Sequence, residues 1–323
     1  LRLVGSEMCI RDSCCCVPLF HCFGVVLATM NCLTHGCTQV MVERFNPLVV
    51  LASVHKERCT ALYGVPTMFI AELHHPMFDL FDMSSLRTGI MAGSLCPVEL
   101  MKQVEEKMYM KVTSVYGLTE AAPGMTATRI DDSFDVRCNT VGRDFEHTEV
   151  KVIDPETGEE CPVGVQGEMC NRGYNTMKGY YKNPQATAEV IDKNGFLHSG
   201  DLGVKDEDGN YRITGRIKDM IIRGGENICA REIDDDLMGC PGVGETATIG
   251  MPDERLGERI CTFVAPLGNA LPTLESVTAY LEGAGVPKRL WPERIEIIEE
   301  IPKTLMGKVR RNVLTDELAC RMA

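Results

Sequence analysis

The sequence lacks the features that define several large classes of protein. Its 33 Lys and Arg are outnumbered by 46 Asp and Glu, and the formal net charge of -13 argues against nucleic-acid or anionic-membrane partners, which require basic faces. The strongest apolar run, residues 17–30, is too short and too interrupted by His21 and Gly24 to span a bilayer. We therefore expect no transmembrane segment and assign this run to a buried helix.

Common catalytic signatures are also missing. There is no Gly-x-Ser-x-Gly elbow for a serine hydrolase, and none of the 7 histidines has a second His four positions later, as in zinc proteases. Residues 242–247 (GVGETA) match a dinucleotide-binding fingerprint, but they precede a predicted strand. That fingerprint must follow a strand and open a helix, so we dismiss the match.

Cysteine is abundant, but its spacing does not indicate a metal or redox motif. The 16 cysteines include no Cys-x-x-Cys pair. The run 14–16 beside His21 and Cys22 offers ligands for a metal, but we favour buried free thiols, which are common inside apolar runs. Because no secretory leader is recognisable, we expect a reducing compartment, either the cytoplasm or an organellar matrix.

The chain is long enough for more than one domain, and its pattern changes along its length. From residue 17 to 115, helix-length and strand-length segments alternate, which favours a mostly parallel sheet covered by helices. From residue 138, alternating strands surround the turns Asp-Pro-Glu-Thr-Gly and Glu-Asp-Gly-Asn, which indicates antiparallel structure. Beyond Asp219 a mixed pattern returns, with Thr273 as the expected cap of an amphipathic helix.

We therefore predict an α/β multidomain protein. Residues 1–13 have no periodicity and are set aside as a non-native leader. Residues 14–217 form a large domain, with a partial parallel α/β subdomain to about 137 and a β-barrel-like subdomain over 138–217. Residues 218–323 form a small α+β domain, with the boundary at Lys218.

The pentapeptide YGLTE, Tyr116–Glu120, follows a predicted strand and exposes a hydroxyl next to a carboxylate. Thr119 can donate to a phosphate oxygen, and Glu120 can help to hold an oxygen-preferring cation such as Mg²⁺. An ordinary glycine-containing loop is the alternative.

The stretch from Ser199 to Gly225 contains a second group of polar residues. Asp201 can accept hydrogen bonds from both hydroxyls of a ribose, and the forked guanidinium of Arg216 suits ribose and phosphate oxygens. Gly224 and Gly225 permit a positive φ or the close approach of a narrow ligand. A turn-forming Asp, a surface ion pair and a plain β-turn are the alternatives.

Lys308 ends the segment PKTLMGK, Pro302–Lys308, which we predict to be a loop. A lysine on such a loop can swing into a site and offset negative charge on a reacting phosphate. A solvated surface lysine is the alternative.

Taken together, these segments resemble the adenylate-forming superfamily of acyl-CoA synthetases, carrier-protein adenylation domains and luciferases. The nearest likeness is to medium- or long-chain fatty acyl-CoA synthetases. The matching segments, in chain order, are PLFHCFG (18–24), AGSLCP (92–97), YGLTE (116–120), GYYKNPQAT (179–187), SGD (199–201), GRIKDMIIRGGENI (215–228) and PKTLMGK (302–308).

The resemblance implies two half-reactions and a small mobile C-terminal domain. A carboxylate such as a fatty acid attacks the α-phosphate of Mg·ATP to give an acyl-adenylate and pyrophosphate, and the thiol of CoA then displaces AMP. The implied roles at the nucleotide are Thr119 and Glu120 for phosphate and Mg²⁺, Ala92, Gly93 and Ser94 for the adenine and acyl end, Asp201 and Arg216 for ribose, and Lys308 for adenylation. Tyr116, Gly117 and Gly224 are further cofactor-binding residues, and Gly225 matches the pantetheine passage of CoA. Lys218 matches the hinge, and His21 lies by the acyl pocket.

The sequence departs from the family pattern in two places. Nothing before Val17 resembles the Ser/Thr/Gly-rich phosphate loop of the family, so we expect a ligase parent and a chain that is inactive or nearly so. Cys229 and Ala230 stand where relatives usually carry an aromatic–Pro pair, which we expect to disturb the start of the next helix.

Other functions stay open at this point. The runner-up is an adenylating ligase that loads a carrier protein, followed by a luciferase-type oxygenase. A non-catalytic fragment that binds adenylate is the alternative from another class. Residues 64–68 are apolar, which favours an acyl chain over an amino acid, and the sequence assigns no oligomeric state.

Overall fold

The computed structural model describes residues 12–93, 96–268, 271–304 and 307–322. The chain divides into two compact units, one of residues 1–199 and 204–213 and the other of residues 200–203 and 214–323. The division after Ile213 lies a few residues before Lys218. Lys218 as the hinge stays a prediction.

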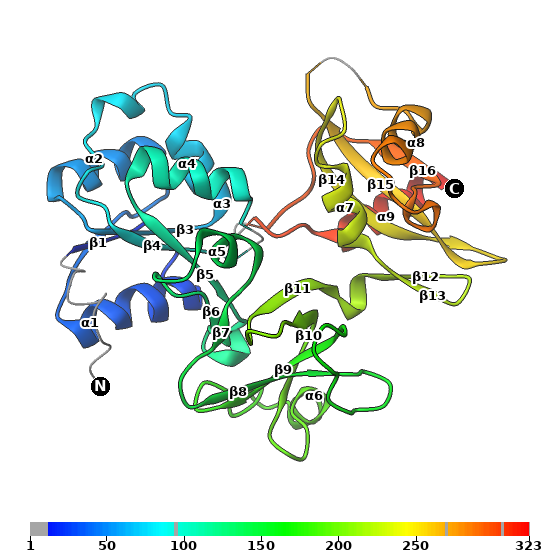
Figure 1. Cartoon of the computed structure of the whole chain (residues 1–323), viewed down its shortest axis with the longest axis horizontal. Coiled ribbons are helices and arrows are strands. Elements are labelled where there is room, and N and C mark those ends of the chain that lie inside the picture. The colour runs from blue at the N-terminus through cyan, green and yellow to red at the C-terminus, as the bar shows by residue number, and fades with distance from the viewer. Residues whose placement is uncertain (1–11, 94–95, 269–270, 305–306, 323) are drawn as a thin grey trace. The chain divides into compact units, whose positions relative to one another are not determined.

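The first unit is built on a seven-stranded sheet (Figure 1). Its strands, in the order β2-β1-β3-β4-β5-β6-β7, are β2 (Thr38–Met41), β1 (Asp12–Cys15), β3 (Ala61–Gly64), β4 (Thr88–Ala92), β5 (Lys111–Tyr116), β6 (Thr126–Ala127) and β7 (Arg143–Asp144). The first five are parallel, and β6 and β7 are antiparallel. The predicted parallel sheet is confirmed.

Strand β1 corrects the boundary of the expected leader. It begins at Asp12, lies between β2 and β3, and its residue Ser13 is fully buried. Asp12 and Ser13 therefore belong to the fold, because their backbones pair with the neighbouring strands on both sides. The rest of the predicted leader lies outside the described residues.

Helices cover this sheet, and local signals set their ends. Figure 1 shows α2 (Pro47–Glu57), α3 (Pro66–Leu73) and α4 (Val98–Met108) on one face of the sheet, with α1 (Asn31–His35) on the opposite side. The side chain of Asn46 accepts a hydrogen bond from the Val49 amide at 3.3 Å and so caps α2. Shorter helices are η3 (Phe78–Leu80), η4 (Thr119–Ala121) and α5 (Phe134–Asn139).

The helix expected from the apolar run is present, but it is only partly buried. The π-helix η2 (Phe23–Met30) continues into α1, and only Phe23, Gly24 and Ala28 of η2 are buried. Apolar side chains predict a helix here, but they do not specify how many faces are covered. Val25 and Met30 are exposed.

A second sheet follows, of four strands in the order β11-β10-β9-β8. The strands are β8 (Thr148–Ile153), β9 (Gly167–Gly173), β10 (Leu197–Lys205) and β11 (Tyr211–Arg216), with α6 (Pro184–Val190) between β9 and β10. Asp154 and Asp206 accept backbone hydrogen bonds in the two predicted turns. Among the described residues this barrel-like subdomain is an open sheet of four strands, consistent with the predicted fold.

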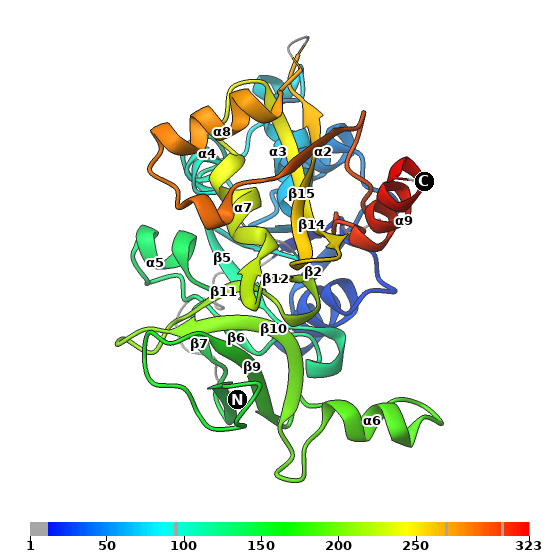
Figure 2. The same ribbon diagram turned by 90° about the vertical axis from the view of Figure 1, so that its right-hand side faces the viewer.

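The second unit contains a sheet of β13 (Glu226–Cys229), β12 (Met220–Arg223), β15 (Gly257–Pro266) and β14 (Val243–Asp253), with β16 (Arg294–Ile297) also paired to β15. Figure 2 shows α7 (Ala230–Leu237) and α8 (Leu274–Gly283) on one side of β14 and β15, and α9 (Arg311–Met322) on the other. The remaining short helices are η5 (Ile217–Asp219) and η6 (Lys288–Leu290).

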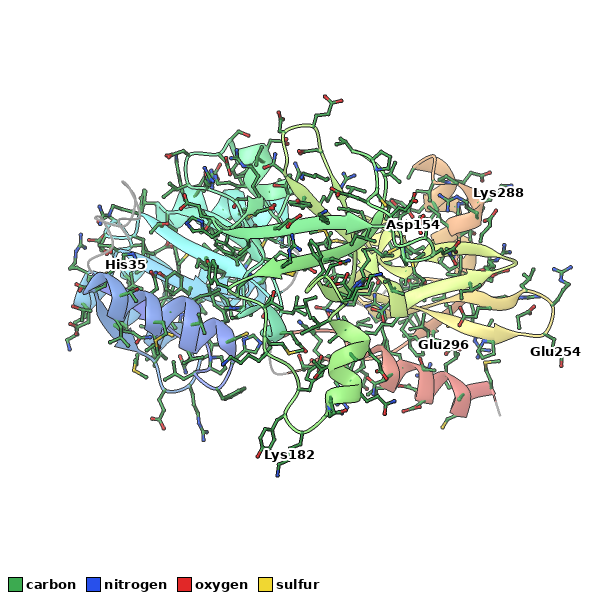
Figure 3. All side chains as sticks on the ribbon, turned by 90° about the horizontal axis from the view of Figure 1, so that it is seen from below. His35, Asp154, Lys182, Glu254, Lys288 and Glu296 are labelled. Carbon is green, nitrogen blue, oxygen red and sulfur yellow. The ribbon has the colours of Figure 1, made fainter. Side chains whose placement is uncertain are left out.

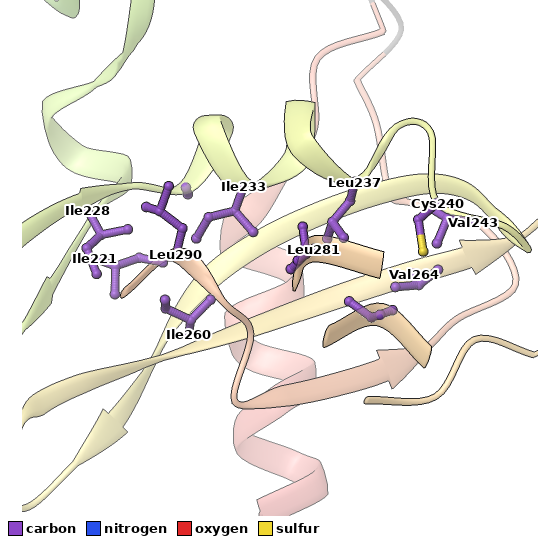
Figure 4. Packing of buried hydrophobic residues seen from close by; sticks show 12 residues of the cluster. Ile221, Ile228, Ile233, Leu237, Cys240, Val243, Ile260, Val264, Leu281 and Leu290 are labelled. Carbon is purple, nitrogen blue, oxygen red and sulfur yellow. The ribbon is translucent and has the colours of Figure 1, made fainter. Parts of the chain in front are cut away.

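The alternation of side chains along β15 explains this three-layer packing. Ile260 and Val264 face a cluster with Ile233 and Leu281 from α7 and α8 (Figure 4). Cys261 and Phe263, at the intervening positions, join a second cluster that contains Leu314 and Leu318 of α9. A strand with apolar residues on both faces must be covered on both sides.

Two further expectations about local structure can be compared with the fold. Thr273 caps α8 in a capping box with Ser276, as predicted. Residues 243–247 lie within strand β14 and open no helix, which agrees with the dismissal of the dinucleotide fingerprint. Among the described residues, none of the helices has the length and apolar character needed to cross a membrane.

Candidate functional site

Several of the predicted site residues follow strands of the seven-stranded sheet. Ala92 ends β4 and Tyr116 ends β5, and the pairing of Ala92 with Val115 places these two strand ends side by side. The carboxyl edge of a parallel sheet is where open α/β folds bind their ligands. Ala92 is buried and Gly93 is exposed at this edge, while Ser94 lies outside the described residues.

The YGLTE segment forms a tight loop that only glycine permits. A Cβ atom on Gly117 would lie 1.8 Å from the carbonyl oxygen of Pro123. The Met125 amide donates to the carbonyl of Tyr116 at 2.9 Å and closes the loop. The glycine is therefore required by close backbone approach, and the loop presents the short helix η4 at the sheet edge.

Thr119 begins η4 and contacts residues that follow β1. Its hydroxyl lies 3.6 Å from the thiol of Cys22, and the Nδ1 atom of the adjacent His21 accepts a hydrogen bond from the Phe23 amide at 3.1 Å. Thr119 is exposed and His21 is half-buried. The structure thus brings His21 and Thr119, almost a hundred positions apart, to the same edge of one sheet.

Glu120 is held by the segment that precedes α6. Its Oε1 accepts a hydrogen bond from the hydroxyl of Tyr180 at 2.9 Å, and its backbone carbonyl accepts one from the Met177 amide at 2.8 Å. Burial, followed by the contact with Glu120, raises the pKa of Tyr180, so the phenol remains a donor. A half-buried carboxylate with one oriented oxygen suits a hard cation such as Mg²⁺.

Asp201 and Arg216 form a direct ion pair in the second unit. Nε of Arg216 lies 2.6 Å from Oδ1 of Asp201, and Asp201 is only 5% exposed. The guanidinium is 39% exposed, so the pair has a buried acidic end and an accessible basic end. The two residues were predicted to contact a ribose separately, and the structure shows that they also orient each other.

Cys229 packs beside the end of β11. Its thiol donates to the carbonyl of Thr214 at 2.9 Å, and burial raises its pKa. Helix α7 starts immediately afterwards at Ala230, with Cys229 as its N-cap residue but without a side-chain capping bond. The expected disturbance is thus limited to a missing cap, and the buried face of Ala230, Ile233 and Leu237 still forms the helix.

Gly224 and Gly225 form the two-residue turn between β12 and β13. Their φ values are 60° and 88°, and the flanking residues Arg223 and Glu226 pair across the strands. Positive φ at both central positions defines the hairpin turn that suits twisted strands. Nothing lies within 4 Å of a Cβ built on Gly225, so space is open at the tip of the turn.

Lys218 lies exposed on the short helix η5 between β11 and β12. Its neighbour Asp219 is 3.5 Å from Arg311, which also pairs with Asp234 of α7 at 2.6 Å. Burial raises the pKa of Asp234, and the charge of Arg311 opposes that rise. Arg311, at the start of α9, therefore connects the segment after β11 with the middle of α7.

Lys308 lies on a small hairpin, not on an irregular loop. Lys303 and Val309 form an antiparallel bridge, and the amide of Thr304 donates to the carbonyl of Lys308 at 2.8 Å. The Lys308 amide in turn donates to the Thr304 hydroxyl at 3.2 Å. Lys308 is exposed, and residues 305 and 306 lie outside the described residues.

Two residues that contact this site were not assigned to it from the sequence. Cys22 meets Thr119, and Tyr180 meets Glu120. Both lie in segments used for the family resemblance, so a hydroxyl or thiol within a matched segment was the available signal. Lys182, two residues after Tyr180, points away from the fold (Figure 3).

The fold and these residues together indicate the class of protein to which the chain belongs. A parallel α/β sheet that presents YGLTE at its carboxyl edge, a strand-borne Asp–Arg pair and a small α+β unit with a lysine hairpin constitute the fold of adenylate-forming enzymes. Residues 6–181 match the family of AMP-binding enzymes, and residues 232–308 match the C-terminal domain of AMP-binding enzymes. The chain belongs to the AMP-binding enzyme family.

Individual relatives of the chain are named as acyl-CoA synthetases or ligases. The chain is 48% identical over 97% of its length to a putative acyl-CoA synthetase, YngI, of Bacillus subtilis, and covers 56% of that protein. It is 38% identical over 93% of its length to the mitochondrial medium-chain acyl-CoA ligase ACSF2 of Rattus norvegicus, and covers 49% of it. The chain therefore spans about half the length of these relatives.

A solved structure shows the same fold. The structure of o-succinylbenzoate CoA synthetase from Bacillus subtilis in complex with ATP and magnesium superimposes with a TM-score of 0.82 at 26% identity. The match covers 96% of this chain and 62% of that one.

Proposed function

We propose that the protein is an AMP-forming acyl-CoA synthetase acting on a fatty acid. The observation that supports this most strongly is the Asp201–Arg216 pair, a buried carboxylate oriented by a guanidinium on neighbouring strands. Relatives over nearly the whole chain are named acyl-CoA synthetase or ligase, and one carries the name medium-chain acyl-CoA ligase.

The first half-reaction joins the carboxylate to the α-phosphate of ATP and releases pyrophosphate. We assign Thr119 to a phosphate oxygen and Glu120, oriented by Tyr180, to Mg²⁺, which offsets phosphate charge when bound. Lys308 supplies positive charge at the reacting carboxylate and phosphate. Tyr116, Gly117, Ala92 and Gly93 line the adenine and acyl end, and His21 lies toward the acyl chain.

The second half-reaction transfers the acyl group to a thiol. The thiol attacks the acyl carbonyl, the carbon–oxygen bond to the phosphate breaks, and AMP leaves. We assign the ribose to Asp201 and Arg216 in both steps, the pantetheine arm of CoA to Gly224 and Gly225, and the pivot for a domain movement to Lys218. The open space at the Gly225 turn supports this assignment. A reducing compartment, cytoplasmic or organellar, suits the described cysteines, all of which are free thiols.

A fusion tests the proposal. In the fusion, the 323 residues replace the matching segment of the Bacillus subtilis relative. The purified fusion protein is incubated with ATP, Mg²⁺, octanoate and CoA. We expect octanoyl-CoA, AMP and pyrophosphate in equal amounts. Pyrophosphate release with acyl transfer to a carrier protein but not to CoA would instead establish the carrier-loading alternative.

A further inference from the structure

A cluster of three potential metal ligands lies in the four-stranded sheet and includes none of the residues assigned to nucleotide binding. Glu168 and Cys170 are on β9, and His198 is on the adjacent strand β10. Glu168 and Cys170 stand two positions apart, so they share one face of the sheet. One ligand atom from each residue lies within 4.8 Å of the other two. It is the one such group of three that the described part of the chain contains.

The distances match those of a small divalent cation. The thiol of Cys170 is 3.4 Å from Nδ1 of His198. Zinc bonds of about 2.3 Å to sulfur and 2.0 Å to nitrogen place these two ligand atoms about 3.5 Å apart in a tetrahedral site. Nδ1 of His198 is 2.7 Å from Oε2 of Glu168, a hydrogen bond that would open slightly as a metal enters.

The three side chains are mostly shielded from solvent, unlike charged groups on an ordinary protein surface. Cys170 is fully buried, Glu168 is 7% exposed, and the His198 side chain is 31% exposed. An ion can therefore approach past the imidazole and meet the two deeper ligands. Thiolate, imidazole and carboxylate together are the ligand types of Zn²⁺, with a fourth position left for water.

A nucleophilic relay is a poorer explanation. Such a relay needs the histidine to contact the thiol with one nitrogen and the carboxylate with the other. Here the same Nδ1 atom meets both Cys170 and Glu168, and the thiol is buried away from any substrate.

We infer that Glu168, Cys170 and His198 form a zinc-type site that links β9 to β10. On binding, the Cys170 thiol gives its proton to solvent as the sulfur–metal bond forms. The ion ties two strands whose connection includes α6, and it stabilises the folded sheet because the unfolded chain does not hold the three ligands together.

Cobalt titration of the metal-free 323-residue chain tests the inference. We expect one equivalent of Co²⁺ to bind with a thiolate-to-cobalt charge-transfer band, which Cys170→Ser removes. Cys161→Ser, a cysteine in the same sheet region, serves as the matched control and keeps the band. A competing chelator should show binding at least about tenfold weaker in Cys170→Ser and in His198→Gln.

Thermal unfolding provides a second readout that does not depend on colour. Zn²⁺ should raise the Tm of the wild type and of Cys161→Ser, but not that of His198→Gln, whose partly exposed side chain makes misfolding a small risk. A charge-transfer band that survives in Cys170→Ser, or a Tm that does not respond to Zn²⁺ in the wild type, would overturn the site.

Discussion

Asp201–Arg216 and Lys308 belong to the same compact unit, but the fold holds them in different ways. Asp201 lies in the middle of β10, Arg216 ends β11, and the two charges meet at 2.6 Å. Lys308 is an exposed residue on a hairpin that is closed mainly by backbone bonds to Thr304.

This difference corresponds to the proposed roles. In the proposed function the ribose stays bound through both half-reactions, so its ligands are best fixed on regular strands. Lys308 and the Gly224–Gly225 turn are each assigned to one half-reaction, and both lie on hairpins. Loops and turns that move between steps control the rate of many enzymes. We therefore expect substitutions of the strand residues to weaken adenylate binding. Substitutions of the turn residues should slow only one half-reaction.

Lys308→Ala should have the largest effect. In the fusion described above, we expect pyrophosphate release to fall about 100- to 1,000-fold, because a positive charge at the reacting phosphate is lost. Conversion of supplied octanoyl-adenylate to octanoyl-CoA should change little. Lys303→Ala, on the opposite arm of the hairpin, is the control.

An equal loss in both half-reactions would contradict the assignment of Lys308 to one step. It would indicate that the hairpin shapes the whole adenylate site.

Arg311→Met should destabilise the unit that carries these turns by about 3 kcal/mol, because Asp234 would lose its buried partner. Burial already raises the pKa of Asp234 in the folded state. Its contribution to stability is therefore present at low pH and falls as pH rises through that raised pKa. Removing Arg311 raises the pKa further, so the loss should be larger at neutral pH than at about pH 4.

Denaturant unfolding at the two pH values measures this difference, with the exposed Arg310→Met as control. A loss that is the same at both values would show that the Arg311–Asp234 charge pair is not its cause.

Gly225→Ala should have a smaller effect and should be specific to one step. The φ of 88° costs an alanine roughly 1 kcal/mol of stability. We also expect a decrease of about tenfold in thioester formation, since the added methyl fills the open space at the turn.

Gly209→Ala separates strain from function. Gly209 has a φ of 81° and also has nothing within 4 Å of a built Cβ. Gly209→Ala should lower the free energy of unfolding as much as Gly225→Ala does, and it should form thioester at the wild-type rate. If both variants slow the rate equally, Gly225 has no specific role with CoA.

The sequence predicted elements and boundaries better than contacts. Asn46 and Thr273 cap their helices because capping is local chemistry. The contact of Tyr180 with Glu120 joins residues 60 positions apart, and it depends on how a loop before α6 returns to the sheet edge. No local pattern contains that information.

Two other results show the same limit. Glu168 and Cys170 are two positions apart in the sequence, which places them on one face of a strand. Only the pairing of β9 with β10 brings His198 close to them. The apolar run 17–30 predicted a helix correctly and its burial wrongly, because hydrophobicity does not state which neighbours are present to cover it.

The central claim is that the Asp201–Arg216 pair holds the adenylate. Isothermal titration of the 323-residue chain with a non-hydrolysable octanoyl-adenylate mimic tests it most directly, with Asp208→Asn, in an exposed turn, as control. We predict binding of one equivalent by the wild type and the control, and binding roughly 100-fold weaker in Asp201→Asn, since a hydrogen-bonded charge is lost. Equal affinity in Asp201→Asn, or no binding by the folded wild type, would contradict the account.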